Sequence, residues 1–336
     1  MSTSDYMPPY QITPTILRLI EKVGEAIGQI QARDDLKTVP RLRRNNRIKT
    51  IQASLEIEGN TLGLDQVTAL LDGKRVLGLP REIQEVQNAF KAYDGLSSWA
   101  SSSRENLLEA HSFLMEGLVS ESGRFRSGGV GIQRGNELVH VAPPSDRVPW
   151  LVSDLLRWLK TTEIHPLLAS CVFHYEFEFI HPFQDGNGRL GRLWQTLILS
   201  EWNGLFSMLP VETVVRDRQQ EYYAALGVSD QTADSTAFSE FMLLAILDAF
   251  HELAEAADQE GDQASDQVMR LLGEFDGAPL SALELMNRLG LSHRPTFRKN
   301  YIHPALSAGL IEMTHPDSPR AKNQKYRITK RGKAGR

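Results

Sequence analysis

A glycine-rich segment, HPFQDGNGRLGR, occupies residues 181–192 and limits the folds open to this chain more than any other stretch. Gly186, Asn187 and Gly188 stand where a loop turns into a helix. Glycines at such a position let backbone N–H groups converge, and the helix N-terminus adds the positive end of its dipole. The segment therefore predicts an anion-binding loop at the start of a helix.

The charged residues of this segment suit the chemistry of phosphates. Arg189 and Arg192 are three residues apart on the expected helix, so both project to one side and can hold phosphate oxygens. Asp185 is a single carboxylate beside the anion site, which suits Mg²⁺ when substrate phosphates supply further ligands. His181 is the only side chain here that titrates near neutral pH and can accept a proton from a hydroxyl group. A tight turn or a structural histidine explains each feature alone, but the whole set predicts nucleotide phosphoryl chemistry.

Most of the remaining chain has the periodicity of helices, which predicts a mainly α fold. Apolar residues recur at helical spacing from Ile12 to Ile30 and again from Leu107 to Leu118. Residues 131–141 differ, because they read as two short strands joined by Arg134-Gly135-Asn136 in a hairpin. Further helices are expected at residues 48–58, 61–71, 80–96, 148–160, 165–177, 188–202, 216–226 and 238–253.

Composition excludes several classes of protein. The 336 residues are 41% hydrophobic and 24% charged, which is typical of a globular protein with two or three domains. Cys171 is the only cysteine, so neither an internal disulfide nor a cysteine-based zinc finger can form. The net charge of −5 is mild, and no uncharged apolar run is long enough to span a bilayer. The N-terminus lacks a secretory signal pattern, so we expect a cytoplasmic protein with no membrane partner.

The segment at residues 181–192 resembles, at every defining position, the motif of the Fic family, His-Pro-Phe-x-Asp/Glu-Gly-Asn-Gly-Arg-x-x-Arg. The resemblance extends upstream through Gly123-Arg-Phe-Arg126, the hairpin and Ala142-Pro-Pro-Ser145, and downstream through Glu221-Tyr-Tyr223. It implies an all-helical core with one β-hairpin, the flap, whose exposed edge can pair with an extended protein segment. It also implies a nucleotidyltransferase that transfers AMP from ATP to a Ser, Thr or Tyr hydroxyl of a protein.

The resemblance implies a role for each residue of the loop. His181 would deprotonate the target hydroxyl, and Asp185 would bind Mg²⁺ on the α- and β-phosphates. Asn187 and the backbone at Gly186 and Gly188 would hold the α-phosphate and stabilise the charge that develops in the transition state.

The two arginines and a pair of downstream tyrosines complete the expected nucleotide site. Arg189 would contact the β-phosphate region, and Arg192 would contact the γ-phosphate. Tyr222 and Tyr223 are candidates for the wall against the adenine ring, and an ordinary core role for them stays open. The implied cofactors are ATP and Mg²⁺.

A segment near the N-terminus, Ser54-Leu-Glu-Ile-Glu58-Gly59-Asn60, resembles the inhibitory motif of the same family, Ser/Thr-x-x-x-Glu-Gly/Asn. Ser54 and Glu58 are four residues apart and share one helix face. The resemblance implies that Glu58 pairs with Arg192, which cannot give its guanidinium both to a carboxylate and to a γ-phosphate. We therefore expect an autoinhibited enzyme that modifies a protein substrate, itself included. Whether Glu58 also helps to remove AMP stays open.

The C-terminal region reads as a separate basic module. We expect an N-terminal helical region with the inhibitory helix at residues 1–100, a catalytic core at 101–256, an acidic linker at 258–265 and a winged helix at 267–336. Arg294, Arg298 and Lys299 would lie on its second helix and could contact the phosphates of DNA. A role in packing or dimerisation is an equal alternative, so a homodimer stays open. A DNA-binding regulator with a nucleotide-sensing Fic core is the competing function.

Overall fold

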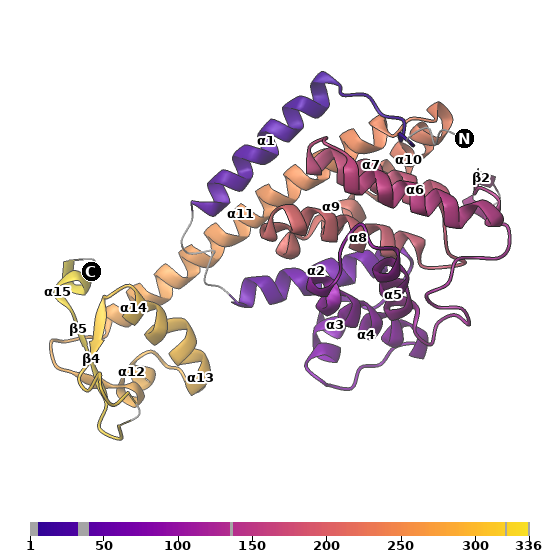
Figure 1. Ribbon diagram of the computed structural model, residues 1–336. Helices are drawn as coiled ribbons and strands as arrows, with labels where there is room; N and C mark the ends of the chain where they lie inside the picture. The colour runs from indigo at the N-terminus through magenta and orange to yellow at the C-terminus, as the bar shows by residue number, and fades with distance from the viewer. Residues whose placement is uncertain (1–5, 33–39, 135–136, 320, 335–336) are drawn as a thin grey trace. The chain divides into compact units, whose positions relative to one another are not determined.

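A computed structural model of the chain describes residues 6–32, 40–134, 137–319 and 321–334 (Figure 1). The chain divides into two compact units, residues 1–253 and residues 254–336. The boundary falls within one long helix, α11 (Thr236–Gly273). No described helix is both long and apolar enough to cross a membrane.

The first unit is mainly helical, which confirms the predicted fold class. Short 3₁₀ helices, η2 (Leu96–Ser98), η3 (Ser145–Arg147) and η4 (Gly204–Met208), connect some of its elements. Its α-helices before α11 are α1 (Pro14–Gln31), α2 (Pro40–Ile57), α3 (Leu64–Leu71), α4 (Pro80–Gly95), α5 (Arg104–Met115), α6 (Val148–Thr161), α7 (Pro166–Ile180), α8 (Asn187–Trp202), α9 (Val211–Asp217) and α10 (Gln219–Thr232).

Helix α7 packs against α1, α6 and α8. It begins at Pro166, and the preceding His165 caps it, with a side chain that accepts a hydrogen bond from the Leu167 N–H. Its side chains are buried on nearly every face, including Phe173 and Phe177, as expected of a helix that is apolar all round. Because α7 packs against α8, the loop between these two helices is held by the core on both sides.

The predicted hairpin is present as strands β1 (Gly131–Arg134) and β2 (Glu137–Val141). The two strands are antiparallel, with Gly131 opposite Val141 and an irregularity in register between Ile132 and Gln133. Two residues of the predicted turn, 135 and 136, lie outside the described residues.

Two sequence interpretations of the helices need correction. Residues 258–265, expected to form a linker, continue as helix within α11. Their glutamine, glutamate and alanine residues are good helix formers, so a polar composition does not interrupt the helix here. The single helix expected at residues 216–226 is instead α9 followed by α10, because the backbone of Arg218 (φ −111°, ψ 32°) leaves the helical conformation.

The second unit combines short helices with a three-stranded antiparallel sheet of order β3–β5–β4. The sequence from Leu280 to Gly290 predicts a helix, but Leu280 and Ser281 form strand β3, whose pairing with β5 outweighs local helix propensity. This order of elements agrees with the predicted winged helix, which stays an interpretation. The elements after α11 are β3 (Leu280–Ser281), α12 (Ala282–Arg288), α13 (Arg294–Phe297), the π-helix η5 (Arg298–Ile302), α14 (His303–Ser307), β4 (Ile311–Met313), β5 (Lys325–Ile328) and α15 (Lys330–Ala334).

Candidate active site

The glycine-rich loop connects α7 to α8 and has a left-handed backbone at each end. His181 ends α7 with φ 48° and ψ 62°, a conformation that is uncommon for residues other than glycine. Gly186 precedes the first residue of α8 with φ 85°. A Cβ atom at position 186 would lie 2.6 Å from the Met115 sulfur, so only glycine fits this turn. The loop is therefore fixed in shape, with backbone that is left-handed at the predicted base.

The inner side of the loop is fixed by aromatic packing. Phe183 is fully buried and stacks on His111, with ring centroids 3.7 Å apart and an interplanar angle of 8°. The His111 Nδ1 accepts a hydrogen bond of 2.8 Å from the Gly123 N–H. Its Nε2 therefore carries the proton and donates it to the Asp185 carbonyl oxygen at 3.0 Å. Burial lowers the pKa of His111 to about 4, so this histidine is neutral near pH 7.

Arg126 joins the loop to the base of the hairpin. Its side chain is buried, and no described carboxylate pairs with it. Instead the guanidinium donates to backbone carbonyl oxygens, with Nε 2.7 Å from that of His181. Because these carbonyls include the C-terminal end of α7, the cation lies at the negative end of a helix dipole. The other acceptors are the carbonyl oxygens of Gly128, Pro143 and Ile180.

Asn187 is buried and forms both its side-chain hydrogen bonds with Phe183. Its Oδ1 accepts from the Phe183 N–H, and its Nδ2 donates to the Phe183 carbonyl, both at 2.9 Å. In this conformation Asn187 closes the loop on itself. Its predicted contact with an α-phosphate stays a prediction.

Arg192 lies one turn into α8 and contacts the N-terminal region of the chain. Its Nη2 is 2.7 Å from Glu58 Oε1 and 3.0 Å from the Ser54 carbonyl oxygen, and its Nε is 3.0 Å from Ser54 Oγ. The arginine side chain is 3% exposed and that of Glu58 35%. Burial alone would lower the pKa of Arg192, but the facing Glu58 carboxylate raises it above its usual range. The arginine is thus a permanent cation whose donors are directed at Ser54 and Glu58.

The Glu58 carboxylate also lies against the start of α8. A Cβ atom on Gly188, in the first turn of that helix, would be 2.3 Å from Glu58 Oε1. The carboxylate therefore occupies space at a helix N-terminus, where backbone N–H groups and the helix dipole favour a negative charge. Glu58 thus places a negative charge of the protein itself at this helix N-terminus.

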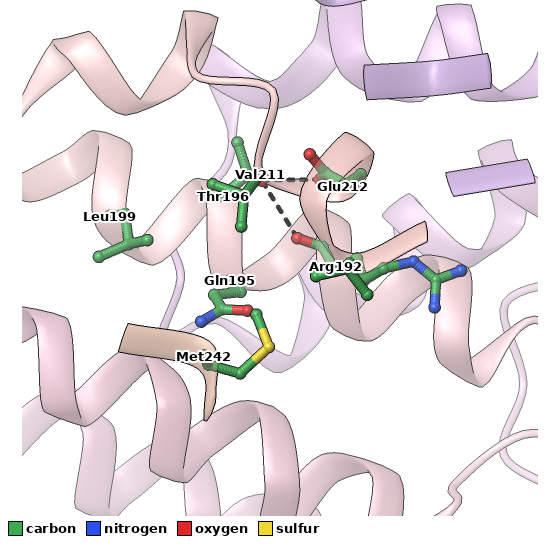
Figure 2. A pocket seen from close by; sticks show the side chains of 8 residues that line it. Arg192, Gln195, Thr196, Leu199, Val211, Glu212 and Met242 are labelled. Carbon is green, nitrogen blue, oxygen red and sulfur yellow. Dashed lines mark hydrogen bonds between the residues drawn. The ribbon is translucent and has the colours of Figure 1, made fainter. Parts of the chain in front are cut away.

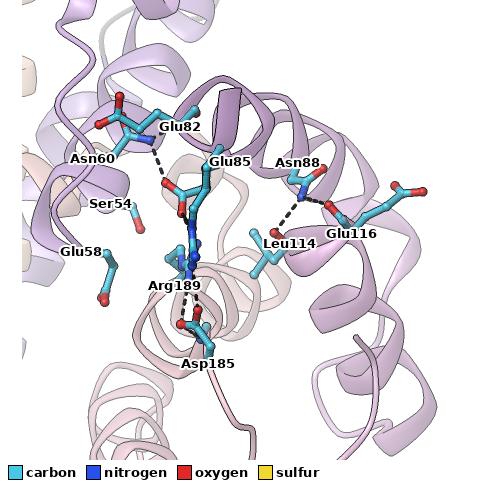
Figure 3. Close-up of polar contacts among 12 residues, drawn as sticks. Ser54, Glu58, Asn60, Glu82, Glu85, Asn88, Leu114, Glu116, Asp185 and Arg189 are labelled. Atoms are coloured by element: carbon cyan, nitrogen blue, oxygen red, sulfur yellow. Dashed lines mark hydrogen bonds and ion pairs between the residues drawn. The ribbon is translucent and has the colours of Figure 1, made fainter. Parts of the chain in front are cut away.

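The remaining two charged residues of the loop pair with each other and with α4. Arg189 Nη2 is 3.0 Å from Asp185 Oδ1, and its Nη1 is 3.3 Å from Glu85 Oε1 (Figure 3). Asp185 Oδ2 is 3.2 Å from Arg81 Nη2. Among the described residues, no group of three or more His, Cys, Asp or Glu side chains could hold a metal ion. One half-exposed carboxylate fits Mg²⁺, which takes few protein ligands and several from phosphates and water.

The two predicted adenine-facing tyrosines differ in burial. Tyr222 is 2% exposed, and its hydroxyl lies 3.3 Å from His174 Nε2 among the rings of Phe238 and Phe241. Tyr223 is half-buried beside it. The core role left open for this pair describes Tyr222 in this conformation, and an adenine contact stays a prediction for both.

A small cavity is lined by Arg192, Glu212 and neighbouring residues of α8, α9 and α11 (Figure 2). Its volume of about 10 Å³ is at the lower limit for one water molecule. Glu212 lines it, with Oε1 accepting from the hydroxyls of Tyr93 at 3.1 Å and Thr196 at 3.3 Å. Its Oε2 has no hydrogen-bond partner among the described residues. Burial raises the pKa of Glu212 to about 7.

The structure thus gathers the loop residues with Ser54 and Glu58, and it adds five residues that sequence reasoning gave no role. Arg126 belongs to the segment Gly123-Arg-Phe-Arg126, which resembles the family, but the sequence does not indicate what its side chain contacts. The other four show no local signal, because their partners lie far along the chain. The five are Arg81, Glu85, His111, Arg126 and Glu212.

Two models of protein families match parts of this chain. The Fic/DOC family model matches residues 101–199. A second model, for the C-terminal domain of the Fic-like filamentation induced by cAMP protein, matches residues 266–329.

Two curated relatives are similar over part of their length. The protein adenylyltransferase fic-1 of Caenorhabditis elegans is 30% identical over 227 residues, which cover 64% of this chain and 42% of that protein. A probable protein adenylyltransferase of Aquifex aeolicus is 30% identical over 185 residues, or 54% of each chain. The chain therefore spans about half, or less, of these relatives.

A solved structure, a Fic family protein from Desulfovibrio desulfuricans G20, matches over almost its whole length. It is 59% identical, covers 97% of this chain and 99% of its own, and superposes with a TM-score of 0.74. Such identity, sustained from end to end and not only across the loop, shows that this chain belongs to the Fic family.

Proposed function

We propose that the chain is a protein adenylyltransferase that transfers AMP from Mg-ATP to a hydroxyl group of a protein. The observation that carries the proposal is the position of Glu58, whose carboxylate lies at the N-terminus of α8 and on Arg192. A site that holds a carboxylate in this way has the donors and the charge to hold phosphate oxygens instead. The names of the curated relatives support the same activity.

In this mechanism the loop positions the reactants and stabilises charge. Arg189 and Arg192 bind the β- and γ-phosphates, while Gly186, Asn187 and Gly188 surround the α-phosphate. The imidazole of His181 accepts the proton of the incoming hydroxyl. The hydroxyl oxygen forms a bond to the α-phosphorus, and the bond from that phosphorus to pyrophosphate breaks.

Asp185 is the one residue of this chain that we propose as a ligand of the metal. Asp185 would hold Mg²⁺, which supplies positive charge against the phosphate oxygens when it is bound. The side chain is 40% exposed, and its Oδ2 faces the exposed cation Arg81, which a metal ion can replace. Its Oδ1 is held by Arg189 and by the Gly186 N–H. The donor set of one carboxylate plus phosphates is the one that Mg²⁺ commonly takes.

The flap and the inhibitory helix complete the proposal. The hairpin β1–β2 would hold an extended segment of the target by strand pairing, which reads backbone more than sequence. Glu58 would keep ATP misaligned by occupying Arg192, and transfer depends on alignment. Self-modification fits this mode of recognition, and removal of AMP by the same site stays open. A homodimer is not needed for chemistry, because one chain supplies every residue named here.

The test is transfer of AMP onto protein. The full chain is incubated with Mg-ATP as wild type, as Glu58→Gly and as Glu58→Gly with His181→Ala, and intact masses are measured. We expect an added AMP on Glu58→Gly and about a hundred- to ten-thousand-fold slower transfer without His181. Transfer that continues at the same rate in the His181 variant would contradict the proposed base. No adduct on the chain or on added cell extract would reject the activity.

A second function is proposed for the second unit, binding to the phosphates of duplex DNA. Arg294, Arg298, Lys299 and His303 line one surface hollow along α13, η5 and α14. Arg294, Arg298 and Lys299 form no ion pair with a described acidic residue, and Arg294 and Lys299 are exposed, so these cations can contact phosphates. Anisotropy of labelled duplex DNA, titrated with salt, tests this, and binding that lacks salt dependence would contradict it.

A further inference from the structure

Helix α4 places two charged residues, one turn apart, beside the glycine-rich loop. Arg81 Nη2 is 3.2 Å from Asp185 Oδ2, and Arg81 Nε is 3.5 Å from Glu85 Oε1. The same Glu85 oxygen is 3.3 Å from Arg189 Nη1, and Arg189 returns to Asp185 at 3.0 Å. Two arginines and two carboxylates therefore alternate in a closed ring, of which Figure 3 shows the row from Glu85 through Arg189 to Asp185.

The ring is connected to the end of the inhibitory helix. The second oxygen of Glu85 accepts a hydrogen bond of 2.8 Å from Asn60 Nδ2, two residues after Glu58. Thr61 donates from its N–H and from its hydroxyl to Glu82 Oε1, both at 2.8 Å. The segment that follows α2 is thus hydrogen-bonded to the first turns of α4. Glu58 and the charges of α4 belong to one connected structure.

Each charged side chain proposed to bind Mg-ATP is consequently paired with a residue from the N-terminal helices. Arg192 faces Glu58, Arg189 faces Glu85, and Asp185 faces Arg81. The Glu58 contact obstructs a phosphate. The contact of Arg81 obstructs the metal, because a guanidinium and a divalent cation are like charges that need the same carboxylate oxygens.

Exposure identifies the part of the ring that opens first. The side chains of Arg189 and Glu85 are 6% and 13% exposed, whereas those of Asp185 and Arg81 are 40% and 61% exposed. The Arg81 guanidinium can leave the ring for water at a small cost in free energy, since exposed ion pairs contribute little to stability. Arg189 has no such route, because its side chain stays enclosed.

We propose that Arg81 is a second inhibitory residue, which competes with the divalent cation for Asp185 and leaves for solvent when the metal binds. The proposal rests on the proposed binding of Mg-ATP. It implies that releasing Arg192 by Glu58→Gly does not release Asp185. The Glu58→Gly enzyme would therefore still need a higher metal concentration for half-saturation than it would need without Arg81.

The experiment measures metal binding directly, in the Glu58→Gly background of the full chain. Free Mn²⁺ is followed by electron paramagnetic resonance in the presence of a non-hydrolysable ATP analogue, with and without Arg81→Gln. We expect the added substitution to lower the half-saturating Mn²⁺ concentration about two- to fivefold, as befits an exposed pair. Arg157→Gln is the matched control, since Arg157 and Asp154 form a pair of similar exposure on α6, and it leaves the concentration unchanged.

A second measurement separates competition from general loosening of the N-terminal helices. Binding of the same analogue without metal, in the presence of a chelator, is measured by calorimetry. Competition predicts that Arg81→Gln leaves this affinity unchanged or weakens it, because a cation near the phosphates is lost. Tighter binding both with and without metal would overturn the proposal, as would an unshifted Mn²⁺ concentration. If the Glu58→Gly protein binds no metal–nucleotide complex at all, the proposed function fails and this inference with it.

Discussion

The basic side chains proposed to bind phosphate lie in opposite environments in the two units of this chain. In the first unit the arginines of the glycine-rich loop are buried and paired, Arg192 with Glu58 and Arg189 with Glu85. In the second unit Arg294 and Lys299 are exposed, and neither pairs with a described acidic residue. Both sets suit phosphate, but only the buried set has a carboxylate of the protein already in place.

The difference follows from desolvation. A buried cation without a partner is costly, so a phosphate site inside a folded unit needs an internal carboxylate whenever the ligand is absent. Water solvates the exposed cations of the second unit, so these cations do not need a carboxylate partner. On the proposal above, inhibition by Glu58 would follow from placing the phosphate site inside a folded unit, where an unpaired cation is costly.

The largest effect is expected when the carboxylate of Glu58, the partner of the buried Arg192, is removed. Glu58→Gly frees the donors of Arg192, and hydrogen bonds between charged groups contribute enough that transfer of AMP should rise about ten- to a hundredfold. The rate is measured with labelled ATP. Glu56→Gly is the control, because Glu56 lies in the last turn of α2, two residues before Glu58, and pairs with Arg216 instead. An equal rise in both variants would mean that the helix end, and not the carboxylate, restrains the site.

Glu212 tests the rule that a buried charge needs partners, since one of its oxygens has none among the described residues. Its folded-state pKa of about 7 lies above the usual carboxyl value, so the fold favours the neutral form. The resulting stability is fully present below the unfolded pKa and is lost as pH rises through about 7. Urea unfolding from pH 5 to 8 should show the wild type losing roughly 2 kcal/mol relative to Glu212→Gln. Parallel pH profiles would show that Glu212 is ionised throughout.

The second unit provides the opposite test, because its cations should act independently of any carboxylate. Replacing Arg294, Arg298 and Lys299 by alanine should weaken duplex DNA binding roughly tenfold or more and reduce the slope of affinity against salt by about 0.9 for each phosphate contact. Anisotropy at several salt concentrations measures both quantities. A control with Arg288→Ala and Arg327→Ala removes cations that already pair with Asp276 and Glu312 and should change the slope less. Equal losses would erase the distinction between paired and unpaired cations.

The loop could be predicted from sequence because its chemistry is local. Twelve consecutive residues carry the anion site, the proposed base and both arginines, and helix periodicity supplied most of the surrounding fold. The pairing of Glu58 with Arg192 could be expected from the family resemblance alone, since these residues are 134 positions apart.

The residues that sequence reasoning missed act across long separations. Glu85 and Arg189 are 104 positions apart, and no spacing rule connects them. Arg126 was visible in a motif, but its role depends on carbonyl groups gathered only by the fold. Strand β3 could not be predicted, because two residues are too few to show a periodicity. The polar part of α11 could not be predicted either, because charge alone does not distinguish a linker from a polar stretch of helix.

The smallest expected effect concerns the ring of charges around Glu85. It distinguishes the residue proposed to bind metal, Asp185, from the residue proposed to bind phosphate, Arg189. Glu85→Gln keeps the shape and the bond to Asn60 but removes the anion that holds Arg189. Binding of the ATP analogue without metal should tighten about two- to fivefold, a small effect because Asp185 still holds the same arginine. Glu116→Gln, which removes the partner of Lys91 beyond the site, is the control for charge. Weaker binding in Glu85→Gln would mean that this carboxylate orients Arg189 for phosphate, and that buried partners assist the site as well as restrain it.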